Sequence, residues 1–231
     1  MKIREIKAFP LAYPEPHYKG VERYITLARI ETEEGLVSWG ECIAQFREAA
    51  LATQIIIEQG LGPLLLGEDV SDVERLWHKM QARIWWYGPE GIAAFAVSAL
   101  DMALWDLKGK GVGLPVCQLL GGQLHEKVVA MASFIFDMDD LDWTVNEFRW
   151  LREQGYWFVK AGWGMRPEAI FGMDRKRDLE IVRRVREVIG DDLELVVDTP
   201  GVRGLWDVPT AIQRFRSLEP YRLRWIEQPL L

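Results

Sequence analysis

Three short apolar runs in the second half of the chain each end in a charged residue. They are residues 158–159 before Lys160, residues 193–197 before Asp198, and residues 225–226 before Glu227. Apolar runs separated by helical patterns are typical of buried parallel strands, and parallel α/β folds collect their chemistry at the C-terminal ends of such strands. We therefore expect one amine and two carboxylates to meet at one rim of a parallel sheet.

The second half alternates strand and helix patterns, as a parallel sheet requires. Strands are predicted at 128–134, 157–161, 193–197 and 223–226, and helices at 141–154, 174–189 and 209–218. Gly155 and Gly190 mark the ends of the first two helices, since glycine is a common C-terminal stop. A closed eight-stranded barrel needs about 200 residues or more. The second half has room for only about four βα units, so the sequence predicts an incomplete barrel or an open sheet.

The first half predicts an α+β unit, because a run of strands is followed by a run of helices. Strands are expected at 2–9, 24–31 and 36–40 as an antiparallel meander, and helices at 48–61, 71–84 and 91–107. The segment 60–63 carries the Gly and Pro stop signals of the first helix, and Ser71-Asp72-Val73-Glu74 has the form of a capping box for the second. Residues 13–20 are expected to form a polar, aromatic loop, either a plain connection or a lid over a ligand.

Composition limits the classes of partner. The chain has 231 residues, 49% of them hydrophobic, and a formal net charge of −7, which argues against a nucleic-acid footprint. Cys42 and Cys117 are too few for a disulfide framework and are expected to be small core residues. We find no run long enough for a membrane span and no signal-peptide pattern, so a cytoplasmic protein without membrane partners is expected.

A sequence motif in the third predicted helix identifies a family. It consists of residues 96–110, which include Asp101-Met102-Ala103-Leu104-Trp105-Asp106, followed by Leu114-Pro115-Val116 and Leu119-Leu120-Gly121-Gly122. This motif resembles the signature of the mandelate racemase and muconate lactonising enzyme branch of the enolase superfamily. The resemblance covers essentially the whole chain and implies a capping domain over residues 1–122, followed by the first half of a modified (β/α) TIM-type barrel over residues 123–231. In this family the signature helix is structural, which assigns its aspartates to packing and hydrogen bonding.

The resemblance also assigns roles to the three strand ends. Asp198 resembles the first metal-ligand aspartate, and Glu227, in Trp-Ile-Glu-Gln-Pro-Leu, resembles the second ligand on the next strand. Lys160, in Val-Lys-Ala-Gly, resembles the second lysine of a Lys-x-Lys pair, which is commonly the base that removes a proton next to a carboxylate. The implied cofactor is Mg²⁺, a hard ion that carboxylate oxygens hold and that neutralises a developing enediolate. Beside Mg²⁺, the pKa of Lys160 is expected to fall toward neutrality.

The implied reaction is abstraction of an α-proton from a small carboxylate substrate. Acid-sugar dehydration is the leading expectation, and racemisation or cycloisomerisation is the alternative. The substrate-reading residues implied by the resemblance lie on two loops of the capping domain. They are His17, Tyr18 and Lys19 on the first loop, and Gln45 and Arg47 on the second. A cationic Lys19 or Arg47 would suit a carboxylate or polyhydroxy acid.

The chain departs from the family pattern in three ways. Phe158 occupies the position of the first lysine, and Asp198-Thr199-Pro200-Gly201 replaces the common Asp-Ala-Asn. The third metal ligand and the opposing acid or base would lie beyond Leu231. Half a barrel would expose the edge of its last strand, which favours a homo-oligomer or a longer polypeptide. A non-catalytic remnant that acts only by association is therefore the second hypothesis.

Overall fold

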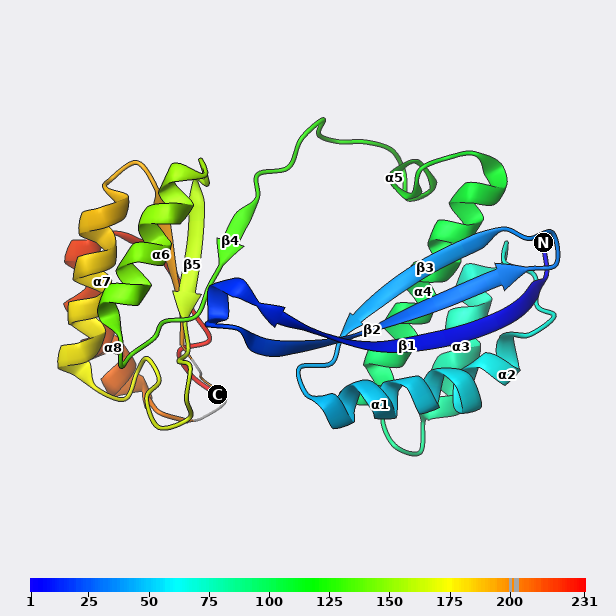
Figure 1. The fold of residues 1–231 in the computed structure, drawn as a ribbon, viewed down its shortest axis with the longest axis horizontal. Helices are drawn as coiled ribbons and strands as arrows, with labels where there is room; N and C mark the ends of the chain where they lie inside the picture. The colour runs from blue at the N-terminus through cyan, green and yellow to red at the C-terminus, as the bar shows by residue number, and fades with distance from the viewer. Residues whose placement is uncertain (200, 202–203) are drawn as a thin grey trace. The chain divides into compact units, whose positions relative to one another are not determined.

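The chain forms two compact units. The computed structural model describes residues 1–199, 201 and 204–231, and its units are Met1–Glu126 and Lys127–Leu231. The sequence places the domain boundary after Gly122, whereas the structural division falls a few residues later. Residues 122–130 contain no helix or strand and connect the two units (Figure 1).

An antiparallel sheet of order β1-β2-β3 organises the first unit. Its strands are β1 (Ile3–Glu15), β2 (Val21–Thr32) and β3 (Val37–Ile43). The register places Ala28 opposite both Ala8 and Gly40. Alternate residues of β2, such as Ala28 and Ile30, are fully buried, as expected for a sheet with one face on a core. The predicted meander is confirmed.

The predicted loop at 13–20 is partly wrong, because β1 continues through Pro10 and Pro14 to Glu15. Tyr13 pairs with Arg23, and the short helix η1 (Pro16–Tyr18) then closes a long hairpin. The sheet order places β1 at an edge. Proline is tolerated in an edge strand because its missing N–H removes no bond from the interior of the sheet.

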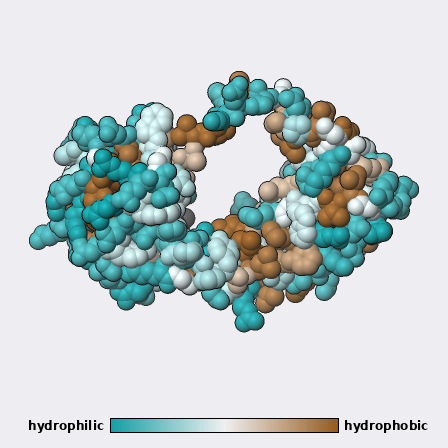
Figure 2. Space-filling view, turned by 45° about the horizontal axis from the view of Figure 1, so that its top comes forward, coloured by the Kyte–Doolittle hydropathy of each residue, from teal (hydrophilic) through white to brown (hydrophobic). Residues whose placement is uncertain are grey.

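Helices follow the strands. They are α1 (Arg47–Ile55), the π-helical turn η2 (Ile56–Leu61), α2 (Gly62–Leu65), α3 (Val73–Ile84), α4 (Ile92–Val112) and α5 (Val116–Leu119). Of these, α1 and α4 pack directly on the sheet. The signature helix α4 packs so closely on β3 that a Cβ on Gly40 would lie 1.8 Å from the carbonyl oxygen of Ala99. This contact explains a glycine at position 40. The outer face of the sheet carries exposed apolar side chains, including Leu11 and Ile43, and hydrophobic residues of this unit reach the surface in Figure 2.

Two predicted helix signals act differently in the structure. The chain does not leave the helical path at 60–63, because Pro63 lies in the first turn of α2, where its missing N–H is not needed. The predicted capping box is wrong, since α3 has no side-chain cap. Ser71 instead directs its amide and hydroxyl to Asp69 Oδ1, at 2.9 and 2.8 Å.

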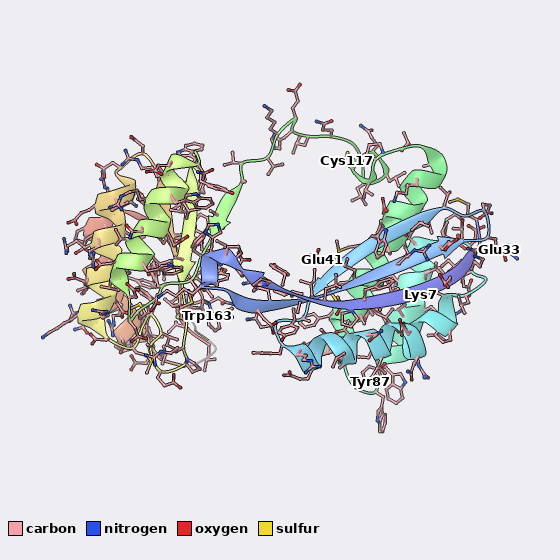
Figure 3. All side chains as sticks on the ribbon, viewed as in Figure 1. Lys7, Glu33, Glu41, Tyr87, Cys117 and Trp163 are labelled. Carbon is pink, nitrogen blue, oxygen red and sulfur yellow. The ribbon has the colours of Figure 1, made fainter. Side chains whose placement is uncertain are left out.

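The two cysteines have different surroundings. Cys42 is buried on β3, as expected, and burial raises the pKa of its thiol to about 11. Cys117 is exposed on α5 (Figure 3), so the prediction of a core residue is wrong there. In the parts of the chain that the structure describes, no helix has the length and apolar composition required to cross a membrane.

A parallel sheet of order β4-β5-β6-β7 organises the second unit. Its strands are β4 (Met131–Ser133), β5 (Phe158–Gly162), β6 (Glu194–Asp198) and β7 (Leu223–Glu227). The connecting helices are α6 (Leu141–Glu153), α7 (Arg175–Ile189) and α8 (Val208–Leu218), with the short η4 (Glu219–Tyr221) before β7. This order confirms the predicted βα repeat, and β4 is shorter than the run predicted for it. The unit is a partial TIM-type barrel.

The two faces of the parallel sheet differ in what covers them. The side chains of Val159, Ala161, Leu195 and Val197 are buried in the core shared with the helices, which lie together on one side of the strands (Figure 1). Successive side chains of a strand point to opposite faces. Lys160 and Asp198 therefore lie on the face away from the helices, at the C-terminal ends of their strands.

Candidate active site

The site is built on three neighbouring strand ends. Lys160 lies on β5 between Ser133 of β4 and Val196 of β6 in the parallel register. Asp198 is the last residue of β6 and pairs with Glu227, the last residue of β7. Lys160 pairs with Val196, which lies two residues before Asp198 on β6. The lysine is therefore slightly further from the C-terminal edge of the sheet than the two carboxylates.

The amine contacts both carboxylates. Lys160 Nζ lies 3.0 Å from Asp198 Oδ2 and 2.8 Å from Glu227 Oε1. The side chains of Lys160 and Asp198 are only 16% and 12% exposed, whereas that of Glu227 is 36% exposed. These contacts confirm the expectation that the three strand ends meet at one rim.

The second oxygen of Asp198 fits a cation site. Asp198 Oδ1 is buried and has no hydrogen-bond partner among the described residues. A buried carboxylate oxygen without a partner is unusual and costly, and an ion is one of its common explanations. Carboxylate oxygens are the ligands that Mg²⁺ prefers. Asp198 and Glu227 therefore suit such an ion, although no group of three or more potential ligands occurs in the described ranges.

Competing effects act on the pKa of Lys160. Burial lowers it, but the hydrogen bonds and charges of Glu227 and Asp198 raise it, and the net direction is upward from the ordinary value. The sequence-based expectation that the pKa of Lys160 falls depends on the positive charge of a neighbouring magnesium ion. The protein groups alone act in the opposite direction, because two anions stabilise the ammonium form.

Gly162 allows β5 and β6 to approach beside Asp198. A Cβ added to Gly162 would lie 1.7 Å from the carbonyl oxygen of Asp198 and 2.6 Å from its carbonyl carbon. Both are backbone atoms, so no side-chain rotation could relieve the overlap. The glycine is therefore a packing requirement of the site. Trp163, labelled in Figure 3, follows it with a left-handed backbone, at a φ of 51°.

Replacing Gly162 with alanine is expected to destabilise the protein by about 1–3 kcal/mol, the usual range for overpacking. The free energy of unfolding from denaturant titration measures this change. Gly60→Ala is the matched control, because the nearest atom to an added Cβ there is a side-chain methyl at 4.0 Å. That variant should be neutral or more stable by up to about 1 kcal/mol. Equal stabilities for the two variants would contradict the packing argument.

The residues expected to read the substrate all belong to the first unit. His17 and Tyr18 lie in η1, and Arg47 begins α1. Lys19 and Gln45 have left-handed backbones, with φ values of 54° and 60°, which are uncommon for residues other than glycine. The guanidinium of Arg23 lies 5.1 Å from the centre of the Tyr18 ring. The substrate role of these five residues stays a prediction.

The sequence did not predict a buried ion pair between helices α7 and α8. Arg214 of α8 lies 3.0 Å from Asp178 of α7, with side-chain exposures of 12% and 3%. Asp178 Oδ1 also accepts the amide hydrogen of Gly172, whose carbonyl accepts hydrogen bonds from Trp206 Nε1 and Arg214. Burial raises the pKa of Asp178 from 3.8 to about 7, although the Gly172 amide and the Arg214 charge lower it.

This network joins the segments that follow β5 and β6. Gly172 lies between β5 and α7, and Trp206 lies between β6 and α8. The sequence contains a signal for this buried charge. Asp178 lies at helical spacing from Ile181, Val182 and Val185, on the face that α7 buries. A charged residue on an apolar stripe requires a partner. The sequence does not single out Arg214 as the partner of Asp178, because the second half of the chain contains several arginines.

An antiparallel α+β unit followed by parallel βα units, with charged groups at consecutive strand ends, defines a capping domain joined to a partial TIM-type barrel. A model of the mandelate racemase/muconate lactonizing enzyme N-terminal domain matches residues 17–121, and a model described as enolase C-terminal domain-like matches residues 143–231. The chain belongs to the mandelate racemase/muconate lactonising enzyme branch of the enolase superfamily.

Characterised relatives in this family are lyases and isomerases. An arabinonate dehydratase of Saccharolobus solfataricus is 30% identical over 99% of this chain and 61% of its own length. A D-galactarolactone cycloisomerase of Agrobacterium fabrum is 31% identical over 89% of this chain and 51% of its own length. The chain thus spans about half to three fifths of the curated relatives it matches.

Solved structures agree with this assignment. The mandelate racemase/muconate lactonizing protein of Paracoccus denitrificans, crystallised with magnesium, aligns with all of this chain and 59% of its own. Its TM-score is 0.83 and its sequence identity is 29%. The fold match therefore covers the capping domain and the beginning of the barrel.

Proposed function

We propose that this chain carries part of a Mg²⁺-dependent site that removes the α-proton of a small carboxylate substrate. The observation that carries the proposal is the convergence of Lys160 Nζ with Asp198 and Glu227, within 3.0 Å of each carboxylate. Asp198 Oδ1, which has no hydrogen-bond partner in the described part of the chain, supports a cation at the same place. Magnesium in the Paracoccus relative supports the choice of ion.

Each residue has a separate task in this proposal. Asp198 and Glu227 would hold Mg²⁺ through carboxylate oxygens, and Lys160 would accept the proton next to the substrate carboxylate, which leaves an enediolate. When bound, Mg²⁺ supplies positive charge against the negative charge that develops in this step. The limited exposure of Lys160 and Asp198 would restrict the access of water to these two side chains during proton transfer.

An acid sugar is the proposed substrate class, and dehydration is the proposed outcome. The name of the Saccharolobus relative, an arabinonate dehydratase, supports this choice. The Agrobacterium relative supports the alternative, cycloisomerisation or racemisation, because these reactions share the same first proton abstraction. His17, Tyr18, Lys19, Gln45 and Arg47 are the residues that we propose to recognise the substrate.

The test uses the full-length polypeptide that carries this sequence. Mg²⁺ affinity is measured by calorimetry, and exchange of the α-proton in D₂O is followed by NMR over a panel of acid sugars. Asp198→Asn should weaken Mg²⁺ binding by about 100-fold or more, since loss of an outer-shell partner alone costs about 10–100-fold. Asp142→Asn is the control, because Asp142 lies on α6 with an 82% exposed side chain. Unchanged affinity in Asp198→Asn would refute the metal assignment.

Association is the second candidate function, and one observation favours it. Strand β7 is the last strand in the order of the parallel sheet that the described residues form, and Trp225 on it is 43% exposed. Unpaired edges and exposed aromatic residues favour pairing with another chain. A homo-oligomer in sedimentation experiments, without α-proton exchange in the full-length polypeptide, would support a non-catalytic remnant. The cytoplasmic location stays a prediction.

A further inference from the structure

Thr199 joins the two strands that bear the carboxylates. It follows Asp198 directly and is only 3% exposed. Its amide donates to the carbonyl oxygen of Glu227 at 3.0 Å. Its hydroxyl lies 3.0 Å from that same oxygen and 2.7 Å from the carbonyl oxygen of Gln228. Glu227, which ends β7, and Gln228, which follows it, are therefore both bonded to Thr199, the residue directly after β6.

The hydroxyl bond supports an unusual backbone conformation. Gln228 has a φ of 48°, which places a residue with a side chain in the left-handed region directly after Glu227. Such conformations persist where their surroundings fix them. The Thr199 hydroxyl carries a single hydrogen, and the shorter distance favours donation to Gln228. This bond holds the turn that ends β7 beside Glu227.

Gly201 brings a second part of the same segment against that turn. A Cβ on Gly201 would lie 2.1 Å from the Gln228 carbonyl oxygen and 2.7 Å from the Leu230 carbonyl oxygen. Residues 199 and 201, which follow β6, therefore approach the same stretch of backbone after β7. An alanine at position 199, as in the Asp-Ala-Asn pattern of the family, has no hydroxyl to make the first of these contacts.

We propose that Thr199 is a positioning residue that fixes the separation between the Asp198 and Glu227 carboxylates and so sets the affinity of the site for a divalent cation. The inference rests on the proposed function, since it assumes that these carboxylates share an ion. Asp198 is adjacent to Thr199 in the chain, and the carbonyl oxygen of Glu227 accepts the amide hydrogen of Thr199 directly. Loss of the hydroxyl would leave the register intact through the Thr199 amide but would release the turn at Gln228.

The experiment compares Thr199→Val and Thr199→Ser in the full-length polypeptide. Valine keeps the shape of threonine without its hydroxyl, and serine keeps the hydroxyl. Thr199→Val should weaken Mg²⁺ binding by about tenfold or more, within the range known for groups that orient metal ligands. It should also accelerate amide hydrogen exchange in residues 223–228 of the metal-free protein. Thr199→Ser should retain parental affinity within about twofold, because the same hydrogen bond can form.

Thr53→Val is the matched control. Thr53 is fully buried in the first unit, and its hydroxyl donates to the Ala49 carbonyl at 2.8 Å. This variant should leave Mg²⁺ affinity unchanged even where stability falls. Thr199→Ala replaces Thr199→Val if the valine variant does not fold.

The possible results separate the two proposals. Parental Mg²⁺ affinity in Thr199→Val, or an equal loss in Thr53→Val, would overturn the positioning role while leaving the metal site standing. A parent protein that binds no Mg²⁺, with Asp198→Asn indistinguishable from it, would overturn the proposed function and this inference together. Weaker binding in Thr199→Val, recovered in Thr199→Ser, supports the positioning role.

Discussion

Lys160→Met is expected to reduce α-proton exchange of an acid-sugar substrate by about 10²- to 10⁴-fold, the usual contribution of a positioned general base. Methionine retains much of the apolar stem but cannot accept a proton. Mg²⁺ binding should persist, because Asp198 and Glu227 remain and the ammonium no longer occupies their oxygens. Exchange is measured by NMR in D₂O, and ion affinity by calorimetry on the same samples.

The comparison of exchange with ion binding distinguishes a base from a counter-ion. Lys176→Met serves as the control, because Lys176 is an exposed lysine in the first turn of α7, on the helix that follows β5. It should exchange substrate protons at the parental rate. Parental exchange in Lys160→Met would show that Lys160 only neutralises the two carboxylates, and the proposed base would have to be abandoned.

Arg214→Met is expected to destabilise the protein by about 3–5 kcal/mol near pH 8, since removal of one partner leaves the buried Asp178 charge uncompensated. Asp178 is 3% exposed and has Arg214 as its ion-pair partner at 3.0 Å. Denaturant titration gives the free energy of unfolding. Arg216→Met on the same helix is the control, because Arg216 is exposed and surface changes usually stay within about 0.5 kcal/mol.

The loss in Arg214→Met should depend on pH. Burial raises the folded-state pKa of Asp178 from 3.8 to about 7, so its contribution to stability is complete below the unfolded pKa and is lost as the pH rises through about 7. Below pH 6 the folded carboxyl is largely neutral and has less need of a cation. The destabilisation by Arg214→Met should therefore be smaller at pH 5.5 than at pH 8. A loss that is independent of pH would contradict an ionised Asp178.

Strand ends were predictable from the sequence because several local signals agreed there. The apolar runs before Lys160, Asp198 and Glu227 are short, bounded and separated by amphipathic helices. In a parallel sheet this pattern leaves little choice of geometry, since C-terminal ends of neighbouring strands share one edge. The order of the four strands and the contact among the three charged groups followed from that constraint.

The wrong predictions involve residues whose effect depends on their neighbours in space. Pro14 does not end β1, because that strand is at the edge of its sheet, a position the sequence does not reveal. Ser71 has the spacing of a cap, yet Asp72 is the N-cap residue of α3, and the Ser71 hydroxyl donates to Asp69. Cys117 was expected in the core because cysteine is commonly buried, but the short α5 leaves it at the surface.

Thr199 and Arg214 were missed for a related reason. Each acts through a partner distant in sequence, a backbone carbonyl after β7 in one case and a carboxylate on α7 in the other. Neither a hydroxyl after a strand nor an arginine on a helix is distinctive by itself. Local patterns identify the elements, and the bonds between them become evident with the tertiary structure.

The arrangement of one charged residue on each successive strand has a consequence for folding. Two complete helices, α7 and α8, separate Lys160 from Glu227 in the chain, so their contact closes a long loop and forms late relative to local structure. During synthesis, Glu227 can reach Lys160 only after β7 has left the ribosome and added to β6. Formation of the charged cluster would therefore report that the sheet has been completed as far as β7.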